Sequence, residues 1–323
     1  MSELLILSEE DVQRALPMRE AIEAMRDAFA ALSAGEAQIP VRTSVPLENG
    51  LGLAMLGAWG GVAGVKWATV HPGNPAHGRP AVGAMMLLTD AATGEPMALV
   101  SARALTAIRT GAGSGLATDL LARPDASVCA VIGAGVQAER QLEAVCTVRP
   151  ITRGLVISRS PARAEDFAVR MTRQLEIPVE VASRERLREA DVICVATNSL
   201  TPVLFNEDVA PGTHINAVGA HHPEQAELDA ALVRRARVVV DHRETCAAEA
   251  GDLLLAGLDV LSLPEIGELK VGGSQLASGS VSSARAGEVT VFKSVGNAVQ
   301  DLAAAVRAIE AAKREGLGRA AAL

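Results

Sequence analysis

Three basic side chains lie in apolar stretches of the N-terminal half of the chain. Arg42 falls in a predicted strand at residues 41–46, Lys66 in the apolar strand Val62-Ala-Gly-Val-Lys-Trp, and Arg109 in a predicted helix rich in Ala, Leu and Gly. Burying a cation costs free energy unless an anion pairs with it, and few carboxylates lie near these positions in the sequence. We therefore predict that the three cations bind the carboxylate of a small acid, with the guanidinium groups as a bidentate clamp. The alternative is an internal salt bridge, or side chains that reach the surface.

His221 is the candidate proton donor. It follows a predicted strand at residues 213–218, in the segment His214-Ile-Asn-Ala-Val-Gly-Ala-His-His-Pro223, and ligands of parallel sheets bind at the carboxyl ends of strands. Imidazole titrates near neutral pH, so His221 can deliver a proton there, although an exposed loop histidine would give the same pattern. His71 and His77, in an earlier loop, are weaker candidates. No histidine pair has a metal-ligand complement around it, so we predict no metal site.

A glycine-rich turn joins a buried strand to a helix in the middle of the chain. Val128–Ile132 is continuously apolar, Gly133-Ala134-Gly135 is the turn, and Val136–Val145 has helical spacing. The first glycine permits the turn, the second lets a pyrophosphate approach the backbone, and Ala138 is small enough for close helix–sheet packing. The N-terminus of the helix offers N–H groups to the phosphates. This order of elements predicts a dinucleotide site.

The end of the next strand indicates which dinucleotide is preferred. An NAD site normally carries Asp or Glu there to bind the ribose 2′-hydroxyl, whereas the strand at Gly154–Ile157 ends in Ser158-Arg159-Ser160. A guanidinium beside small hydroxyls suits a 2′-phosphate. We therefore predict NADPH in preference to NADH; the alternative is that Arg159 is a solvated loop residue.

The elements that position these residues change in character along the chain. Helices are predicted from Ser8 and over residues 18–32, and a sheet-rich stretch follows, with strands at residues 41–46, 51–58, 62–68, 82–89 and 96–101. One long helix covers residues 102–121. A final Ala-rich amphipathic helix, residues 295–315, is predicted to leave the nucleotide domain and to pack on the N-terminal one.

Strands and helices alternate between the two long helices. Beyond those at the glycine turn, strands are predicted at residues 154–157, 179–181, 192–196, 213–218 and 238–240, with helices at residues 162–175 and 185–190. Such alternation predicts an α/β fold, a Rossmann-type doubly wound parallel sheet, beside a mixed α+β domain. We expect residues 123–296 to form the NAD(P)-binding domain, and residues 1–122 with 297–323 to form the substrate-binding and dimerisation domain.

Composition narrows the class of protein. The 323 residues carry a formal net charge of −8 and include four Phe, two Trp and no Tyr, which argues against a nucleic-acid partner. The N-terminus lacks the features of a signal peptide, and no apolar run approaches the ~20 residues of a membrane span. The four cysteines are scattered and fall partly in predicted buried strands. We expect a cytoplasmic protein with reduced thiols and no membrane partner.

Five segments together resemble the ornithine cyclodeaminase/mu-crystallin family. They are Pro40-Val-Arg-Thr43, Ala107-Ile-Arg-Thr110, Ile132-Gly-Ala-Gly-Val-Gln-Ala138, Gly212-Thr-His-Ile-Asn-Ala-Val-Gly219 and Thr290-Val-Phe-Lys-Ser-Val-Gly296. The resemblance covers essentially the whole chain. It implies a homodimer in which a nucleotide domain is combined with a split N-terminal and C-terminal domain that makes the subunit contact. It also implies that Arg42 and Arg109 hold the substrate carboxylate and that Lys66 lies beside it.

Two departures indicate the branch of the family. Where ornithine cyclodeaminase has a catalytic aspartate after Asn-Ala-Val-Gly-x, this chain has His221, and it has Ser158-Arg159 in place of an acidic ribose ligand. Mu-crystallin, a ketimine reductase, also lacks both acids. The resemblance therefore favours an NADPH-dependent reductase of a cyclic imino acid, with Lys66 and His221 as catalytic residues.

The expected reaction converts 1-pyrroline-2-carboxylate or 1-piperideine-2-carboxylate into L-proline or L-pipecolate. Alternatives within the family are ornithine cyclodeaminase, alanine dehydrogenase and cis-3-hydroxyproline dehydratase. The alternative that is not an enzyme is a protein that binds a small ligand in the presence of NADPH. The expected cofactor contacts lie in the glycine turn, at the end of the second strand, and at or after later strands: Gly133, Ala134, Gly135, Val136, Gln137, Ser158, Arg159, Ser160, Ala196, Thr197, Val218, Gly219, Lys293 and Ser294.

Overall fold

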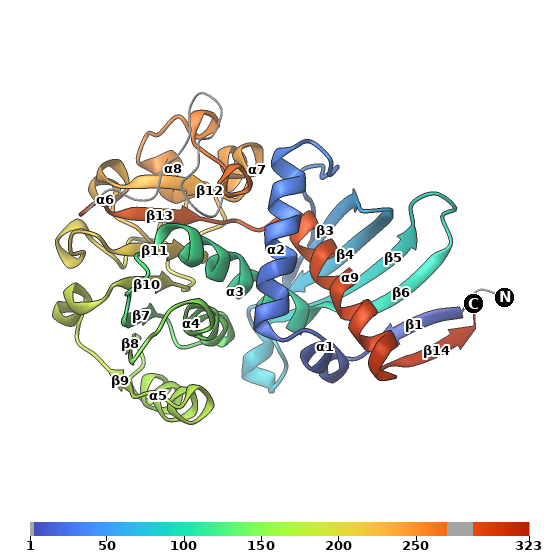
Figure 1. The fold of residues 1–323 in the computed structure, drawn as a ribbon, viewed down its shortest axis with the longest axis horizontal. Coiled ribbons are helices and arrows are strands. Elements are labelled where there is room, and N and C mark those ends of the chain that lie inside the picture. Colours follow the sequence, from blue (N-terminus) through green and yellow to red (C-terminus); the bar gives the residue numbers. More distant parts are fainter. Residues whose placement is uncertain (1–2, 270–286, 323) are drawn as a thin grey trace. The chain divides into compact units, whose positions relative to one another are not determined.

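The chain forms two compact units in a computed structural model, which describes residues 3–269 and 287–322. The split unit consists of Met1–Arg109 with Asn297–Leu323, and the central unit of Thr110–Gly296. Figure 1 shows that each unit contains one sheet. The first boundary lies inside helix α3 (Ala102–Leu121), and the second follows Gly296. The assignment of residues 123–296 to a cofactor domain and of residues 1–122 with 297–323 to a substrate-binding and dimerisation domain stays a prediction.

The split unit is built on a seven-stranded sheet of order β14-β1-β6-β5-β4-β3-β2. Strand β1 pairs in parallel with β6, and all other neighbours are antiparallel. The predicted strands are confirmed within a few residues, while β1 and β14, which close one edge, were missed. The bounds are β1 Glu3–Leu7, β2 Thr43–Leu47, β3 Gly50–Trp59, β4 Val62–Val70, β5 Val82–Asp90, β6 Pro96–Ser101 and β14 Arg319–Ala322.

Helix α9 (Ala298–Glu315) lies against strands β3 and β4, and α1 (Glu9–Ala15) and α2 (Met18–Ser33) pack on it (Figure 1). The predicted return of the last helix to the N-terminal half is therefore confirmed. The predicted start of α1 is confirmed as well, because the Ser8 hydroxyl accepts a hydrogen bond from the Asp11 amide at 3.2 Å while the Asp11 carboxylate accepts one from the Ser8 amide at 2.9 Å.

A pair of glycines lets α9 approach the sheet closely. Gly57 on β3 and Gly64 on β4 are cross-strand partners. A Cβ at Gly57 would lie 3.0 Å from Leu302 Cδ1 and 3.1 Å from Ala298 Cβ, and one at Gly64 would lie 3.2 Å from Leu302 Cδ2. Because side chains alternate along a strand, Lys66, two residues after Gly64, points to the same face as α9.

The central unit is a seven-stranded parallel sheet of order β12-β13-β11-β10-β7-β8-β9. Strands β8 and β9 lie on one side of β7, and the later strands lie on its other side. This is the doubly wound arrangement expected from the sequence. The strands are β7 Val128–Ile132, β8 Arg153–Ile157, β9 Val179–Val181, β10 Val192–Val195, β11 His214–Ala217, β12 Arg237–Val240 and β13 Thr290–Lys293. Strand β13, between β11 and β12, was not predicted.

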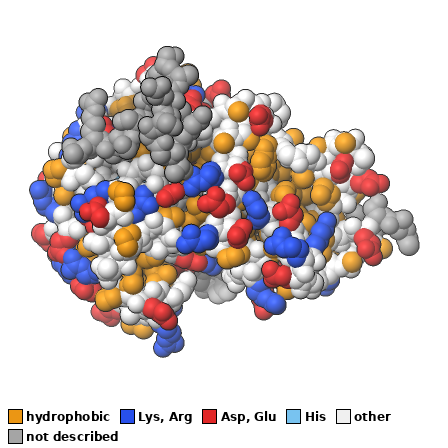
Figure 2. Space-filling view, in the orientation of Figure 1, with side chains coloured by type: hydrophobic (Ala, Val, Ile, Leu, Met, Phe, Trp, Pro, Cys, Tyr) orange, Lys and Arg blue, Asp and Glu red, His pale blue; other side chains and the backbone are white. Residues whose placement is uncertain are grey.

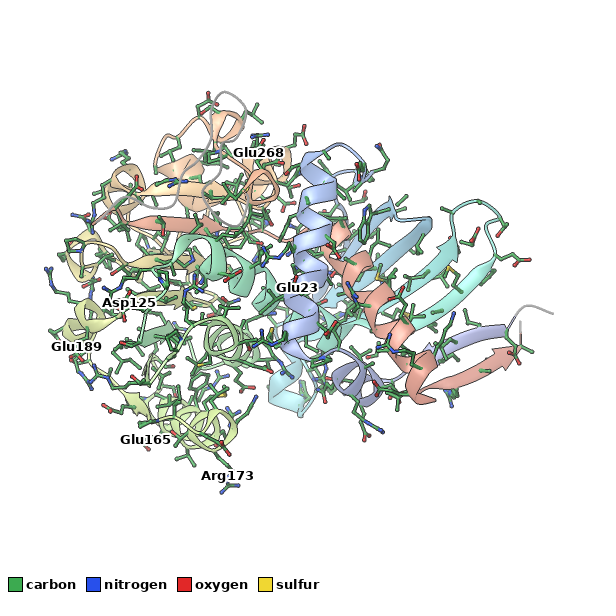
Figure 3. The ribbon with its side chains drawn as sticks, in the orientation of Figure 1. Glu23, Asp125, Glu165, Arg173, Glu189 and Glu268 are labelled. Carbon is green, nitrogen blue, oxygen red and sulfur yellow. The ribbon has the colours of Figure 1, made fainter. Side chains whose placement is uncertain are left out.

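Helices cover both faces of this sheet and bury separate apolar clusters. They are α4 Val136–Val148, α5 Pro161–Leu175, α6 Ala230–Arg235, α7 Arg243–Glu249 and α8 Gly251–Leu255; the helix predicted at residues 185–190 is a 3-10 helix at Arg184–Glu189. Helix α5 illustrates the amphipathic pattern, since Phe167 and Met171 are buried while Glu165 and Arg173 point outward (Figure 3).

The surface is polar on the face shown in Figure 2, where Lys and Arg side chains are interspersed with Asp and Glu. Exposed charges of the split unit form ion pairs, such as Arg307 with Asp27 and Arg103 with Glu9. Among residues 3–269 and 287–322, no helix combines the length and apolarity needed to span a bilayer.

Candidate functional site

Two of the predicted substrate-binding cations meet at one buried carboxylate in the split unit. Lys66 Nζ lies 2.6 Å from Asp301 Oδ2, and Arg109 Nε lies 3.0 Å from Asp301 Oδ1. Asp301 is completely buried, and both cations are buried as well. The structure thus brings Lys66 and Arg109 together in an internal salt bridge, which was the alternative to a bound ligand in the sequence, with Asp301 as a partner that the sequence did not identify.

The first turn of α9 shapes this carboxylate site. Asn297 caps the helix, with its side-chain oxygen accepting from the Gln300 amide at 3.4 Å, while Gln300 Oε1 accepts from the Asn297 amide at 3.0 Å. The same Oε1 also accepts a hydrogen bond of 3.3 Å from Arg109 Nη1. The guanidinium of Arg109 is therefore held by two neighbouring side chains of α9, Gln300 and Asp301.

The charges around Lys66 oppose one another. Burial, with smaller contributions from Arg109 and Arg42, lowers the pKa of Lys66 to about 8, against the opposing effect of Asp301. Burial alone would raise the pKa of Asp301, but Arg109 and Lys66 outweigh it and hold that pKa below its usual value. Asp301 is thus a carboxylate with two cations in contact and a third, Arg42, acting on one of them.

Arg42 lies just before strand β2 rather than inside it, because β2 begins at Thr43. The sequence placed Arg42 within the strand at residues 41–46, so this boundary was wrong by a small margin. We call Arg42, Lys66 and Arg109 the cation group. Lys66 and Arg109 together carry one more charge than the Asp301 carboxylate that they share, so this part of the site is positive when Lys66 is protonated, which suits an anionic ligand.

The glycine turn of the central unit fits a dinucleotide pyrophosphate. Gly133 has a φ of +119°, and a Cβ there would lie 2.5 Å from the Ala196 carbonyl oxygen, so a side chain is excluded. A Cβ at Gly135 would meet no atom of the described chain within 4 Å, which leaves room for a ligand against the backbone. Helix α4 has no side-chain cap at Gly135. Gln137 Oε1 is buried without a hydrogen-bond partner among the described residues.

The end of β8 carries the residues expected at the adenosine ribose. Ser160 caps α5 by accepting from the Arg163 amide at 3.4 Å, and its own amide donates to Ser158 Oγ at 3.3 Å. Arg159 between them is exposed, and within residues 3–269 and 287–322 it makes no hydrogen bond or ion pair. The turn is ordered by the two serines, and the guanidinium is available to a ligand.

Glu227 organises the loops that follow β10 and β11. Its carboxylate accepts four hydrogen bonds: from the Thr197 amide and hydroxyl, both 2.7 Å, from the Gly219 amide at 2.6 Å, and from the Ala220 amide at 3.0 Å. Burial raises the pKa of Glu227, while Lys293 and Thr197 counteract that rise. Thr197 and Gly219, both expected to contact the cofactor, are therefore fixed by a carboxylate that the sequence did not single out.

Lys293 and Ser294, also expected at the cofactor, direct their side chains to internal carboxylates. Lys293 Nζ lies 2.6 Å from Asp252 Oδ2 and donates to the Ala220 carbonyl at 2.5 Å, with Lys293 and Asp252 both fully enclosed. Ser294 Oγ donates to Asp241 Oδ2 at 2.7 Å. These two side chains support the loops of the sheet edge, and the prediction that they contact the cofactor stays a prediction.

His221 lies in the loop held by Glu227 and Lys293. It is exposed, and its Nδ1 is 2.8 Å from the Gly219 carbonyl oxygen. A carbonyl only accepts, so Nδ1 carries the hydrogen and Nε2 is the nitrogen that can exchange a proton. Within the described residues, no group of three His, Cys, Asp or Glu side chains is arranged to hold a metal ion.

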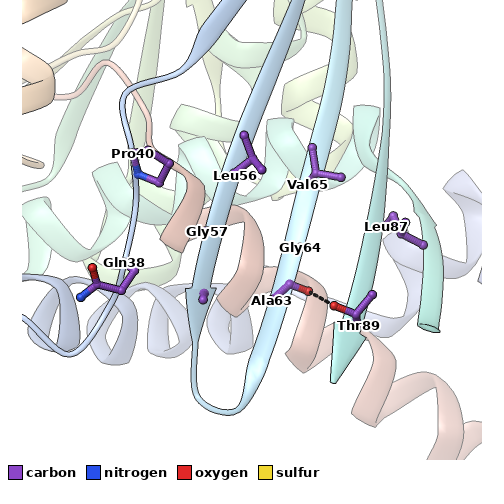
Figure 4. Close-up of a pocket in the computed structure, with 10 residues that line it drawn as sticks. Gln38, Pro40, Leu56, Gly57, Ala63, Gly64, Val65, Leu87 and Thr89 are labelled. Atoms are coloured by element: carbon purple, nitrogen blue, oxygen red, sulfur yellow. Dashed lines mark hydrogen bonds between the residues drawn. The ribbon is translucent and has the colours of Figure 1, made fainter. Parts of the chain in front are cut away.

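A shallow apolar hollow lies on the face of the split-unit sheet opposite α9. Figure 4 shows Leu56, Val65 and Leu87 side by side on three neighbouring strands, with α9 behind the sheet. Strand alternation puts Val45 and Met85 on this same face, which we call the open face. Val45, Leu56, Met85 and Leu87 are between 39% and 54% exposed, which is unusual for large apolar side chains grouped on one sheet.

Comparison with known proteins places these features in context. Residues 2–316 match the ornithine cyclodeaminase/mu-crystallin family. The chain is 36% identical to a delta(1)-pyrroline-2-carboxylate reductase of Bacillus cereus over 323 residues, covering 98% of each protein. The structure of Thermococcus litoralis delta(1)-pyrroline-2-carboxylate reductase with NADH and L-proline is similar, with a TM-score of 0.90, 37% identity, and 98% and 99% of the two chains covered. An archaeal alanine dehydrogenase dimer with bound NAD gives a TM-score of 0.91 at 35% identity, with full coverage of both chains.

Proposed function

The chain belongs to the ornithine cyclodeaminase/mu-crystallin family, and from that premise we propose that it is an NAD(P)H-dependent reductase of a cyclic imino acid. The substrates are 1-pyrroline-2-carboxylate or 1-piperideine-2-carboxylate, and the products are L-proline or L-pipecolate. The observation that carries the proposal is the cation group, in which the buried Lys66 and Arg109 share the single carboxylate of Asp301. Two cations on one carboxylate leave one positive charge, which the carboxylate of a small acid balances.

In the reaction the C=N bond gains a hydride at carbon and a proton at nitrogen. Arg42 and Arg109 hold the substrate carboxylate, which fixes the ring and the direction from which its C=N carbon is approached. When bound, the reduced nicotinamide supplies the hydride. A protonated imine is already electrophilic, so positioning and one proton source are sufficient.

Two side chains are suited to deliver that proton. Lys66, with a pKa of about 8, is largely protonated at neutral pH and lies in the cation group. His221 has its Nδ1 hydrogen-bonded to the Gly219 carbonyl, which sets the tautomer in which Nε2 is the basic nitrogen. We assign a catalytic role to both residues.

Cofactor binding is assigned to the edge of the central sheet. The backbone from Gly133 to Gln137 receives the pyrophosphate, because the turn has no side-chain obstruction and the N-terminus of α4 follows it. Arg159 receives the 2′-phosphate, which makes NADPH the preferred cofactor while NADH remains usable. The T. litoralis relative was crystallised with NADH, so this preference is a feature to be measured in this chain.

The protein acts as a homodimer that uses the open face. The exposed Val45, Leu56, Met85 and Leu87 gain from burial against a second copy, at about 25 cal/mol per Å² of apolar surface. An archaeal alanine dehydrogenase of similar fold is described as a dimer. We place the enzyme in the cytoplasm, since Cys129, Cys194 and Cys246 are buried free thiols.

Alanine dehydrogenase is the second candidate, favoured by the 35% identity and TM-score of 0.91 to the archaeal enzyme. Oxidation of NADPH and of NADH should be followed with the two cyclic imino acids, and with pyruvate plus ammonia. Turnover of a cyclic imine well above that of pyruvate supports the reductase, and the reverse ranking supports the dehydrogenase. Tight binding of the imino acid with no oxidation of either cofactor would instead indicate a ligand-binding protein.

A further inference from the structure

Asp301 is the one member of the substrate site that the proposed function leaves without a role. Each of its carboxylate oxygens contacts one cation, Oδ2 the ammonium of Lys66 at 2.6 Å and Oδ1 the Nε of Arg109 at 3.0 Å. The side chain has no exposed surface. It therefore does not meet solvent, and it acts through the two cations that it holds.

The carboxylate is rigidly placed by the fold. Asp301 follows the Asn297–Gln300 cap of α9, and the approach of α9 to the sheet depends on Gly57 and Gly64. Met55 and Met86 flank Lys66 across the neighbouring strands and are both buried. Lys66 thus emerges between apolar side chains toward a fixed anion.

The arrangement contains more positive charge than an ion pair requires. One buried carboxylate pairs with one cation, and a second buried cation adds a desolvation cost of its own. Arg109 directs Nε to Asp301 and Nη1 to Gln300, while within residues 3–269 and 287–322 its Nη2 makes no hydrogen bond. The planar fork is therefore oriented by α9 and keeps donors for a further planar acceptor.

We propose that Asp301 is a positioning residue for imine reduction: it orients the Arg109 guanidinium for the substrate carboxylate and keeps Lys66 protonated at neutral pH. This inference rests on the proposed function of the cation group. The groups that act on Lys66 are Asp301 from α9, Arg109 from α3 and Arg42 from the segment before β2. Burial and the two arginines lower the pKa of Lys66, and Asp301 alone raises it.

Replacing the carboxylate should therefore produce a particular combination of effects. In Asp301→Asn, Lys66 loses the neighbour that stabilises its charged form, so the alkaline limb of the rate profile should move down by about one pH unit or more. Arg109 loses the charged contact that orients its guanidinium, so kcat at pH 6 should fall about tenfold or more. The KM for the imino acid at pH 6 should stay within about threefold of wild type, because the site loses a negative charge and still attracts the carboxylate.

The experiment compares the purified full-length wild type, Asp301→Asn, Asp301→Glu and a matched control, Asp27→Asn. Asp27 pairs with Arg307 of the same helix α9 at 3.4 Å, but it is exposed, so this control should leave the profile unchanged. Asp301→Glu retains the charge and should restore part of the alkaline limb. Loss of activity in Asp301→Asn with an unshifted limb would overturn the proposal, since that is the behaviour of a residue needed only for folding.

Two further measurements keep the test decisive. If Asp301→Asn does not fold, Lys66→Arg, which cannot deprotonate at accessible pH, should abolish the alkaline limb; a limb that persists refutes the role of Lys66 protonation. Binding of pyrrole-2-carboxylate by calorimetry, from pH 6 to pH 9, does not need turnover. A wild type that binds this acid with the Lys66 pH dependence, yet reduces no imine, would contradict the proposed reaction; a weaker pH dependence of binding in Asp301→Asn would then still support the effect of Asp301 on Lys66. Binding that is equally pH-dependent in wild type and Asp301→Asn would refute the inference alone.

Discussion

Arg109→Lys is the most informative single substitution, because it preserves the charge at Asp301 while removing the planar fork. Arg109 reaches Asp301 through Nε at 3.0 Å and Gln300 through Nη1 at 3.3 Å. A lysine ammonium can replace the contact to Asp301. It cannot at the same time present parallel N–H groups to a substrate carboxylate, because its donors diverge from one nitrogen.

The expected loss follows from that geometry. A hydrogen bond to a charged group contributes about 1.5–3 kcal/mol, and the variant loses one such bond to a desolvated carboxylate. A loss of about 2–3 kcal/mol lowers kcat/KM for the cyclic imino acid roughly 30- to 150-fold. The KM for NADPH should not change, because the glycine turn and Arg159 belong to the central unit and not to the split unit.

The assay follows the loss of NADPH absorbance with two substrates. One is the cyclic imino acid, and the other is the corresponding cyclic imine that lacks the carboxylate. Wild type should use the second substrate poorly, and Arg109→Lys should lose little more on it. An equal loss on both substrates, or a lower melting temperature without a substrate-dependent change, would show that Arg109 serves Asp301 and Gln300 only. In that case the carboxylate clamp is wrong.

Three further predictions concern the cofactor, a buried histidine and the subunit contact. Arg159→Ala should raise the KM for NADPH about tenfold or more and leave that for NADH nearly unchanged, and an equal effect on both would remove Arg159 from the 2′-phosphate site. Burial lowers the pKa of His214 to about 3, so its contribution to stability is complete above its unfolded pKa of about 6.5 and falls as the pH drops toward 3. Measured by urea unfolding, the free energy of unfolding of wild type should fall by about 2 kcal/mol more than that of His214→Gln between pH 7.5 and pH 5. Equal decreases in the two proteins would contradict the lowered pKa of His214. Leu56→Glu on the open face should yield a monomer in light scattering, whereas Val169→Glu, at a 65% exposed site on α5, should not, and a dimeric Leu56→Glu would move the interface elsewhere.

Local patterns predicted most of the fold because they report local physics. The capped start of α1, the strands β3 to β6, the helix α3 and the Gly133 turn each follow from residues that are close in sequence. The strands β1 and β14 were missed because they are short and lie at one edge of the sheet, where pairing between the chain ends defines them. Strand β13 was missed because a short apolar run is compatible with either a strand or a buried helical segment. Its pairing between β11 and β12 is visible only in the folded sheet.

The candidate site was predicted less completely, for a similar reason. The cations could be recognised because a charge among apolar neighbours is visible within a few residues of sequence. Asp301 lies 192 residues from Arg109 along the chain, in a helix whose capping pattern, Asn297-x-x-Gln300, explains an acidic residue in the first turn without any site. Glu227 was missed because three of its four hydrogen bonds come from the backbone amides of Thr197, Gly219 and Ala220. Every residue type except proline has such a donor, so the sequence does not reveal it.

Buried charges also hold residues of two family segments in the central unit. In the central unit, Lys293 of the last segment pairs with Asp252 and holds the Ala220 carbonyl, while Glu227 holds the neighbouring amides. The loop that carries His221 is thus fixed by buried charges, each of which has a partner and cannot be replaced singly without leaving the other unpaired.

In the split unit, buried charges likewise join residues from the two ends of the chain. Its N-terminal residues contribute three cations, and its C-terminal residues contribute α9 with the only carboxylate that contacts Lys66 and Arg109 within the described residues. Without Asp301 of α9, two buried cations would lie among apolar side chains without the carboxylate that both contact, which is unfavourable. The C-terminal helix therefore completes the N-terminal sheet electrostatically as well as by packing, and a chain truncated before Asn297 should lose the cation group as an ordered site.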